Sequence, residues 1–333
     1  MSARATIASM IKFPSLSFSL SRVAVTGASG FVGRALVAQL VALGRVEVLA
    51  MTRQAPENPV AGVKHLLCGD LTLLNQSQPA LAGVHALVHT AARAHVLNDR
   101  AADPLAEFRR VNVMGTLNLA RQAAAMGVKL FVLVSSIGVN GVQSAPSKEF
   151  SETDQPQPHN AYALSKWEAE QGLLRIAEET GLEVVIIRPP LVYGYGAPGN
   201  FGALMRAVQC GWPLPLGAVH NQRSLVALDN LVDFIVTCIT HPQAANQTFL
   251  VSDGQDLSTT ELVRGMAQAA GVPARLLPVP VWALQAGASL LGKGDAVQRL
   301  CGNLQVDISK ARSLLGWMQP VSVEEGLRRA MAV

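Results

Sequence analysis

Short apolar runs alternate with helix-length segments from Arg22 to about Ile187. The runs are continuous rather than alternating with polar residues, which is typical of parallel strands buried on both faces. We expect strands over residues 23–26, 46–51, 63–68, 85–90, 129–136 and 182–187. Helical patterns between them, such as 31–44 and 107–127, end in glycine, where a helix C-cap usually lies. This alternation predicts right-handed βαβ units in a doubly wound α/β sheet of Rossmann type.

The pattern changes after Arg188. Residues 188–205 are rich in proline and glycine, so we expect a loop and a short helix there. The shorter elements beyond predict a smaller C-terminal substrate-binding lobe over the carboxyl edge of the sheet. The most apolar late stretch, 276–292, opens with two prolines and predicts a short helix that is buried or faces the substrate. We therefore expect a dinucleotide-binding domain over 22–188 and a mainly substrate-binding lobe over 189–333.

Residues 1–21 are rich in serine, and the first twenty contain no acidic residue. They lack the long apolar core and the cleavage site of a signal peptide, so a disordered extension is expected. No stretch of the chain predicts stable membrane insertion.

Composition narrows the function classes. Half of the 333 residues are apolar and the mean hydropathy is +0.28, which predicts a large buried core. The net charge of +4 comes from scattered Lys and Arg residues, which argues against nucleic-acid binding. The four cysteines lie far apart, so we expect reduced, mostly buried thiols and a cytoplasmic protein. His85 and His89 share a strand face but lack further ligands, so no metal site is expected.

Three glycines follow the first expected strand directly. Gly27, Gly30 and Gly33 stand in VAVTGASGFVGRAL, where the strand turns into a helix. The first glycine permits a tight turn, the second a close approach of a pyrophosphate, and the third close packing of the helix. The free amides at the helix N-terminus suit phosphate oxygens. The loop and first helical turn, with Ser29, Phe31 and Val32, predict a dinucleotide site.

The end of the second strand selects between NAD and NADP. An NAD site commonly has Asp or Glu there to bind the ribose 2′-hydroxyl. This chain has Met51 at that position and Arg53 two residues later. A guanidinium suits a 2′-phosphate, which it can bind through paired hydrogen bonds. The residues favour NADP(H), with NAD(H) possible.

Tyr162 and Lys166 stand four residues apart, a spacing that also occurs in ordinary surface pairs on a helix. The order of motifs makes the pair informative. The glycine loop is followed, each after a successive strand or helix, by Asp70, Thr90-Ala91-Ala92, Ser135-Ser136 and Tyr162-x-x-x-Lys166. This order resembles the extended short-chain dehydrogenase/reductase family, and within it the nucleotide-sugar epimerases and reductases. The resemblance runs from Arg22 to the C-terminus.

The resemblance implies a catalytic triad of Ser136, Tyr162 and Lys166. A ketone that accepts hydride needs a proton donor, and a phenol has an unperturbed pKa of about 10. A nearby ammonium stabilises the phenolate, so Tyr162 can exchange a proton in either direction. Lys166 would also bind the nicotinamide ribose. Ser136, preferred over Ser135, would hydrogen-bond the substrate oxygen.

The same resemblance assigns further contacts. Asp70 and Leu71 would contact the adenine, Thr90, Ala91 and Ala92 the central part of the cofactor, and Pro189 the nicotinamide. Asn200 and Arg223 would bind the diphosphate of a UDP-sugar. Asn112 would support the active site or simply pack. A homodimer through helices at 103–127 and 160–180 is also implied.

Two departures from the family pattern affect the sugar pocket. Val139-Asn140-Gly141 stands where the family often has Val-Tyr-Gly, and Tyr195 stands where proline is usual. Both leave the proton chemistry intact but put the identity of the sugar in doubt.

Three functions remain open. The sequences LQVDISKARSLLGW and HNQRSLVALDNL are similar to enzymes of bacterial surface-polysaccharide and lipopolysaccharide biosynthesis. They favour NADPH-dependent reduction of the C4 ketone of a UDP-4-keto-6-deoxy-N-acetylhexosamine. The second reading is a UDP-hexose or UDP-N-acetylhexosamine 4-epimerase with tightly bound NAD, ranked lower because of Met51. The third is a non-catalytic NADP-binding regulator, although such relatives commonly lose the Tyr or Lys that this chain keeps. A steroid or flavonoid ketone reductase would leave Arg223 without a purpose.

Overall fold

A single parallel sheet forms the centre of the molecule. The computed structural model describes residues 21–56, 59–73, 79–94, 101–145, 148–290 and 294–332. Within these ranges the sheet has seven strands in the order β3-β2-β1-β4-β5-β6-β9, and every neighbouring pair is parallel. The strands are β1 (Arg22–Thr26), β2 (Glu47–Thr52), β3 (Lys64–Leu67), β4 (Ala86–His89), β5 (Leu130–Val134), β6 (Glu183–Arg188) and β9 (Gln247–Leu250).

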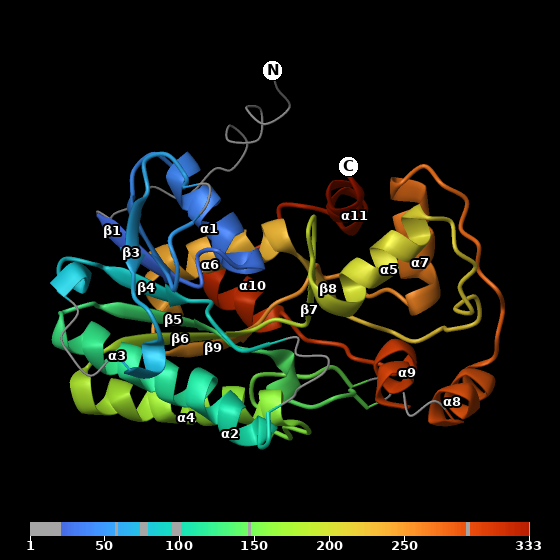
Figure 1. The fold of residues 1–333 in the computed structure, drawn as a ribbon, viewed down its shortest axis with the longest axis horizontal. Helices are drawn as coiled ribbons and strands as arrows, with labels where there is room; N and C mark the ends of the chain where they lie inside the picture. Colours follow the sequence, from blue (N-terminus) through green and yellow to red (C-terminus); the bar gives the residue numbers. More distant parts are fainter. Residues whose placement is uncertain are drawn as a thin grey trace.

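Helices cover both faces of this sheet (Figure 1). One face packs on α1 (Phe31–Ala42), α6 (Leu228–Thr240) and α10 (Ser309–Leu315), and the other on α3 (Gly115–Ala125) and α4 (Ala161–Thr180). Successive strand residues point to opposite layers: Val25 and Val88 lie in the first apolar cluster, and Ala24 and Leu87 in the second. Burial on both faces explains the uninterrupted apolar runs. The doubly wound α/β prediction is confirmed.

The strand order places a ligand crevice. The chain runs outward from β1 through β2 to β3, then crosses back to β4 on the other side of β1. In doubly wound sheets, a reversal of this kind marks the crevice in which ligands bind, which is expected here at the carboxyl ends of β1 and β4. Gly27 follows β1 and Thr90 follows β4, so both loops lie at this crevice.

The predicted strands agree with the observed ones to within one or two residues at most ends. The expected helix at 107–127 is instead α2 (Pro104–Phe108), a π-helical turn (Arg109–Met114) and α3. The sheet also takes β9 from beyond residue 188, and α6 and α10 pack on it. Residues after 188 thus contribute to both halves of the molecule, and the boundary at 188 stays a prediction.

The C-terminal lobe is built on a two-stranded parallel ribbon. It pairs β7 (Leu191–Tyr193) with β8 (Leu225–Ala227), so the expected loop at 188–205 contains a strand before α5 (Gly199–Gln209). Helices α7 (Thr259–Ala269) and α11 (Val323–Met331) pack with α5 around Tyr193, Met266 and Leu327. This third apolar cluster holds the lobe beside the sheet (Figure 1).

The expectation for residues 276–292 is wrong in part. The helix there, α8 (Val281–Leu290), lies with α9 (Gly294–Cys301) at the end of the lobe far from the sheet (Figure 1). Its Trp282 is 72% exposed, and among the α8 side chains that the structure describes only Ala288 is buried, because α8 packs mainly on α9. Val281 does line a cavity of the lobe. No helix within the described ranges is both long and apolar enough to cross a membrane.

The cysteines are free thiols, as expected, but only Cys238 is buried. Cys68 and Cys301 are partly exposed and Cys210 is exposed, so the prediction of mostly buried thiols is wrong. Cys238 lies in the apolar cluster between α6 and the sheet, whereas the other three cysteines lie at the ends of helices or strands.

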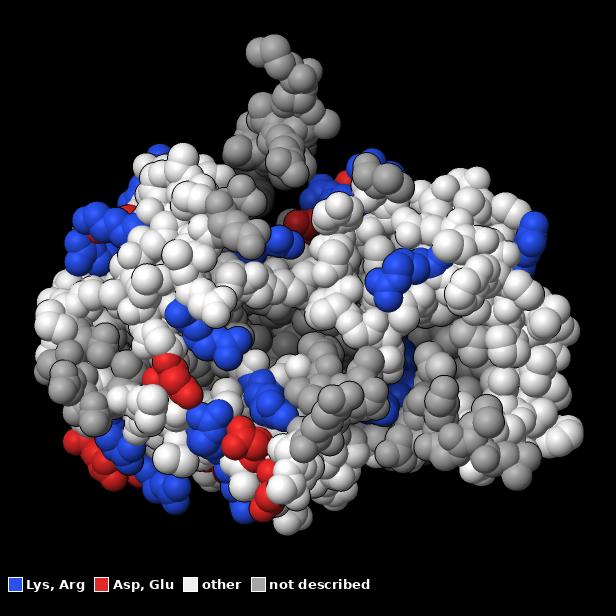
Figure 2. Space-filling view, in the orientation of Figure 1, with Lys and Arg blue, Asp and Glu red and all other residues white. Residues whose placement is uncertain are grey.

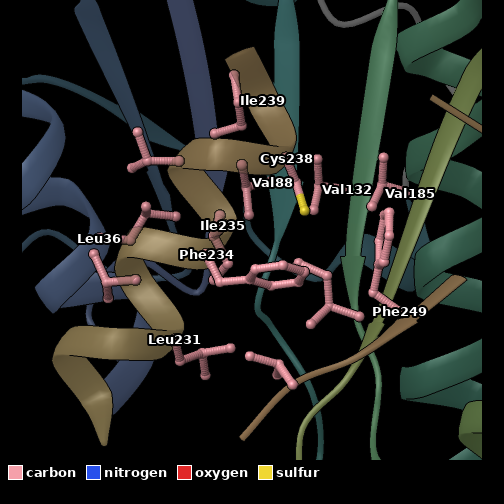
Figure 3. Close-up of a cluster of buried hydrophobic side chains, with 14 of the residues drawn as sticks. Leu36, Val88, Val132, Val185, Leu231, Phe234, Ile235, Cys238, Ile239 and Phe249 are labelled. Carbon is pink, nitrogen blue, oxygen red and sulfur yellow. The ribbon is translucent and has the colours of Figure 1, made fainter. Parts of the chain in front are cut away.

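Aromatic contacts tie α6 to the sheet (Figure 3). The Phe234 ring meets Phe249 of β9 edge-on, with ring centroids 5.6 Å apart, and meets Trp317 at 4.9 Å. The indole Nε1 of Trp317 donates to Asp233 at 2.9 Å, which satisfies its one polar atom. Leu231, one turn away, is completely buried. This layer fixes β9 and α10 against the rest of the sheet.

Leu231→Ala should therefore lower the free energy of unfolding by about 2–5 kcal/mol, because it removes a fully packed side chain and leaves a cavity. Leu174→Ala on α4 is the matched control, since Leu174 is 38% exposed, and it should cost less than about 1 kcal/mol. Urea unfolding followed by circular dichroism measures both. Equal losses in the two variants would contradict the proposed importance of the α6 layer.

Candidate active site

The glycine loop leaves no room for side chains. Gly27 has φ +66°, and a Cβ on it would lie 2.7 Å from the Ala91 nitrogen and 2.9 Å from Thr90 Oγ1. A Cβ on Gly33 would clash with the carbonyl oxygen of Gly27. The loop after β1, the loop after β4 and the first turn of α1 are therefore in direct contact. This matches the roles expected for the first and third glycines.

The start of α1 offers free backbone donors. Gly30 is the N-cap and has no side-chain cap, while its own amide donates to Gly27 O at 2.8 Å. The amides of Phe31, Val32 and Gly33 open the helix, a place where anions bind. The narrow loop and these donors fit the pyrophosphate of a dinucleotide.

The end of β2 contains a further polar group. Met51 is fully buried and Arg53 is exposed, with Thr52 between them. The Thr52 hydroxyl is buried and has no hydrogen-bond partner in the described part of the chain. An unpaired buried hydroxyl at this edge suits an adenosine ribose oxygen. Thr52 is not among the residues predicted from the sequence, because a threonine at a strand end carries no distinctive signal.

The remaining expected cofactor contacts line the same edge. Thr90 donates through Oγ1 to Thr26 O at 2.7 Å, which holds the loop containing Ala91 and Ala92 beside Gly27. Asp70 follows β3, and its carboxylate accepts from Arg110 Nη1 and from the Thr72 amide, both at 2.9 Å. These bonds lower the pKa of Asp70, the Thr72 amide most.

Leu71 and Pro189 lie at the two sides of this edge. Leu71 packs partly into the cluster beneath α3. Pro189 is buried directly after β6, and its carbonyl accepts from the Ile137 amide at 2.9 Å. Their contacts with a cofactor stay predictions.

Ser136 and Tyr162 come together at the end of β5. The Ser136 hydroxyl caps the short turn after the strand by accepting from the Gly138 amide at 3.1 Å. Desolvation raises the pKa of Tyr162 to about 12, and a hydrogen bond with Ser136 acts in the opposite direction. The Tyr162 ring meets Phe108 edge-on at 6.1 Å. Ser135 instead donates to the buried carboxylate of Glu170, so the two serines have different partners, and the catalytic role of Ser136 stays a prediction.

Lys166 is 1% exposed beneath these side chains. Its Nζ donates to the carbonyl of Val134, the last residue of β5, at 2.8 Å. Desolvation lowers its pKa to about 8, and the charge of Glu170 acts in the opposite direction. Because the ammonium has further protons to donate, it can also bind a ribose hydroxyl.

Asn112 connects the cofactor loop to the helix of Tyr162. It lies in the π-helical turn, a feature that often occurs at functional sites. Its side chain accepts from the Arg93 amide at 2.8 Å and donates to Arg93 O at 3.1 Å and Ser165 Oγ at 3.0 Å. Ser165 in turn donates to Tyr162 O at 2.7 Å. The buried Asn112 therefore supports the site through hydrogen bonds.

His89 is a neutral structural residue. Thr116 Oγ1 donates to Asn112 O at 2.6 Å, so it accepts from His89 Nε2, 3.0 Å away. Nδ1 is then the acceptor for Thr26 Oγ1, at 2.6 Å. Burial, and next the charge of Lys166, lower the pKa of His89 to about 3. His85 is partly exposed, and no group of three ligating side chains occurs in the described residues.

The expected substrate residues lie in the C-terminal lobe. Arg223 Nη1 donates to Gly302 O at 2.9 Å, and Asn200 is exposed in the first turn of α5. Neither makes a described contact with Ser136 or Tyr162. A cavity of about 350 Å³ lies near Arg223, lined by Gln143, Ala218, His220, Asn221, Val281, Cys301 and Asn303. Figure 2 shows Lys and Arg side chains around the hollow between the two halves.

A sequence profile described as the NAD dependent epimerase/dehydratase family matches residues 23–252. The chain belongs to this family. The glycine loop, the crevice and the Ser136–Tyr162–Lys166 grouping all fall within the matched residues.

Individual relatives of the family extend the similarity over almost the whole chain. A UDP-glucose 4-epimerase of Vibrio cholerae is 46% identical over 308 residues, which are 92% of this chain and 93% of that protein. The NAD complex of the Thermus thermophilus UDP-glucose 4-epimerase has a TM-score of 0.75, 24% identity and coverage of 93% and 97%. MoeE5 in complex with UDP-glucose and NAD has a TM-score of 0.73, 25% identity and the same coverage.

Acid should destabilise this epimerase/dehydratase family member through His89. Its folded pKa of about 3 lies below the unfolded value of 6.5, so its contribution is complete above pH 6.5 and is lost as the pH falls toward 3. The slope approaches about 1.4 kcal/mol per pH unit. Urea unfolding at pH 7 and pH 5 should show a smaller difference for His89→Asn than for the wild type. The same difference in both proteins would contradict the assignment.

Proposed function

We propose that the chain oxidises and reduces C4 of a UDP-sugar, with 4-epimerisation of a UDP-hexose as the net reaction. The observation that carries this proposal is the 46% identity to a UDP-glucose 4-epimerase over nine-tenths of both chains. MoeE5, which binds UDP-glucose and NAD, supports the substrate class. The retained serine, tyrosine and lysine support catalysis rather than binding alone.

The proposed chemistry assigns each side chain a task. The nicotinamide cofactor, held at the glycine loop, supplies the hydride acceptor and donor. Tyr162, as phenolate, takes the proton of the C4 hydroxyl and returns it when the ketone is reduced. Desolvation raises the pKa of Tyr162, and the positive charge of Lys166 would favour the phenolate in the presence of the cofactor. Ser136 donates to the C4 oxygen and steadies the charge that develops there.

Epimerisation also requires the sugar to present either face of C4 to the same hydride. The tyrosine therefore works in both directions, as acid on one face and as base on the other. Cofactor stays bound between the two half-reactions, so net consumption of nicotinamide is not expected.

Tyr162→Phe should lower kcat for interconversion of UDP-glucose and UDP-galactose by roughly 10²–10⁴-fold, because it removes the proton-transfer group. Affinity for NAD should change little. Chromatography of the UDP-sugars measures the reaction, and nicotinamide fluorescence measures binding. Trp212→Phe is the control, because Trp212 is an aromatic side chain that is 64% exposed and lies after α5. Full activity in Tyr162→Phe would overturn the assignment.

A second function, NADPH-dependent reduction of a UDP-4-keto-6-deoxy-N-acetylhexosamine, is favoured by the end of β2. No carboxylate occupies position 51 to repel a 2′-phosphate, and the Arg53 guanidinium follows in an exposed position. The same triad would protonate the C4 oxygen as the hydride arrives. Stoichiometric loss of NADPH with this substrate would support reduction. Interconversion of UDP-sugars without net loss of cofactor would support epimerisation.

Arg53→Gln tests the cofactor separately from the sugar. If Arg53 binds a 2′-phosphate, NADPH affinity should fall about tenfold while NADH affinity is unchanged. Fluorescence titration with each nucleotide measures the ratio. Arg45→Gln, which lies before β2, is the control. Equal effects on both nucleotides would contradict the preference for NADP(H).

Three expectations remain proposals beside this function. Arg223 and Asn200 would bind the diphosphate, a homodimer would form through α2, α3 and α4, and the protein would act in the cytoplasm. A non-catalytic regulator is the least supported reading, because the triad is complete.

A further inference from the structure

A buried carboxylate lies directly behind the lysine of the proposed triad. Glu170 follows Lys166 by one turn of α4, and each residue is 1% exposed. Lys and Glu four residues apart on a helix ordinarily attract each other, and a low-polarity interior strengthens the attraction. Among the described ion pairs, however, Glu170 pairs with Arg188 and not with Lys166. Lys166 donates instead to Val134 O, at 2.8 Å.

The Arg188 guanidinium donates hydrogen bonds to both oxygens of the Glu170 carboxylate. Its Nη2 donates to Glu170 Oε2 at 2.6 Å, and its Nε lies 3.1 Å from Oε1 and 3.2 Å from Oε2. The Ser135 hydroxyl donates to Oε1 as well. The paired, planar geometry suits a guanidinium and leaves little acceptor capacity for a second cation.

Arg188 is itself held in place from two sides. It is the last residue of β6, and the next residue, Pro189, accepts a backbone hydrogen bond from Ile137. Its Nη1 donates to Asn140 Oδ1 at 3.0 Å. Asn140 is buried and anchored by donating to Ser151 O at 2.8 Å. A residue that departs from the family pattern thus completes the network.

We propose that Arg188 occupies Glu170 so that the Lys166 ammonium stays directed toward Tyr162 and the cofactor ribose. Arg188, Glu170 and Asn140 are positioning residues that act through Lys166. The inference rests on the role of Lys166 in the proposed function.

Removal of Arg188 alone leaves a buried carboxylate without its cation. Such a group is costly, and Lys166 on the same helix is the cation that can satisfy it. The ammonium would then turn away from the cofactor. When both Arg188 and Glu170 are removed, no buried carboxylate remains to draw the Lys166 ammonium away from the cofactor.

Arg188→Met, Glu170→Gln and the double variant test this directly. NADH affinity is measured by fluorescence from pH 6 to pH 10, together with thermal unfolding of each protein. Arg329→Met is the control, because it breaks an ion pair between Arg329 of α11 and Asp229 of α6 outside the proposed site. This variant should bind NADH like the wild type. The measurement needs no sugar, so a protein that binds NADH but fails to convert UDP-sugars would contradict only the proposed function.

At pH 6.5, Arg188→Met should bind NADH about tenfold more weakly than the wild type, as expected for loss of one charge-assisted hydrogen bond. The double variant should recover most of this loss. In the wild type we expect NADH affinity to decline near pH 8, the pKa to which burial lowers Lys166. This pH should be higher in Arg188→Met, where the unpaired carboxylate stabilises the ammonium, and lower in the double variant, which lacks that carboxylate. It should be lowest in Glu170→Gln, where the unpaired Arg188 guanidinium destabilises the ammonium.

A merely structural network would leave that pH unchanged in all folded variants, and this result would overturn the inference. A double variant no better than folded Arg188→Met would overturn it too. If Arg188→Met does not fold, Glu170→Gln and the double variant provide the test. If NADH affinity declines at a lower pH in both than in the wild type, the inference is supported. If it declines at the same pH as in the wild type, the inference is contradicted. Arg188→Lys keeps the positive charge but loses the paired geometry, so its NADH affinity should be intermediate between those of the wild type and Arg188→Met.

Discussion

A lysine ammonium buried at the carboxyl edge of a parallel sheet is the constraint on which the site depends. Such a charge needs partners, and it must keep donors free for a ligand. Lys166 meets both needs because β5 ends at Val134, whose carbonyl accepts from Nζ. The chain then continues into Ser135, which serves Glu170, and Ser136, which faces Tyr162. The end of one strand therefore supplies three different partners to α4.

The cofactor cradle and the proton-transfer residues form one connected structure. Gly27 can approach Ala91 only because it lacks a side chain, so the loops after β1 and β4 touch. The second loop continues to Arg93, whose backbone is held by Asn112. Asn112 reaches Ser165, one residue before Lys166, from a π-helical turn. Close packing of the two loops and the hydrogen bonds of Asn112 therefore connect the glycine loop to α4.

Local patterns made much of this structure predictable, and long-range contacts account for what was not. The apolar runs and the glycine spacing act within a few residues, so the strands and the loop could be read from the sequence. The pairing of β9 with β6 could not be predicted from the sequence, because the residues of a short strand do not show which strand it will pair with. The same holds for Glu170 and Arg188, which meet from different elements. For α8 the apolar pattern suggested burial or a contact with substrate, but the helix packs mainly on α9, a long-range contact that its own sequence does not reveal, and Trp282 stays exposed.

The choice between epimerase and reductase depends on cofactor retention rather than on the triad, because both reactions use the same proton transfer. An epimerase must hold its nicotinamide through two half-reactions, whereas a reductase must release it after one. A Cβ on Gly194 would lie 2.9 Å from Leu228 and 3.5 Å from the Phe31 ring, so the lobe packs closely on the first turn of α1. This contact joins the lobe to the helix that follows the glycine loop, where the proposed epimerase would have to retain its cofactor.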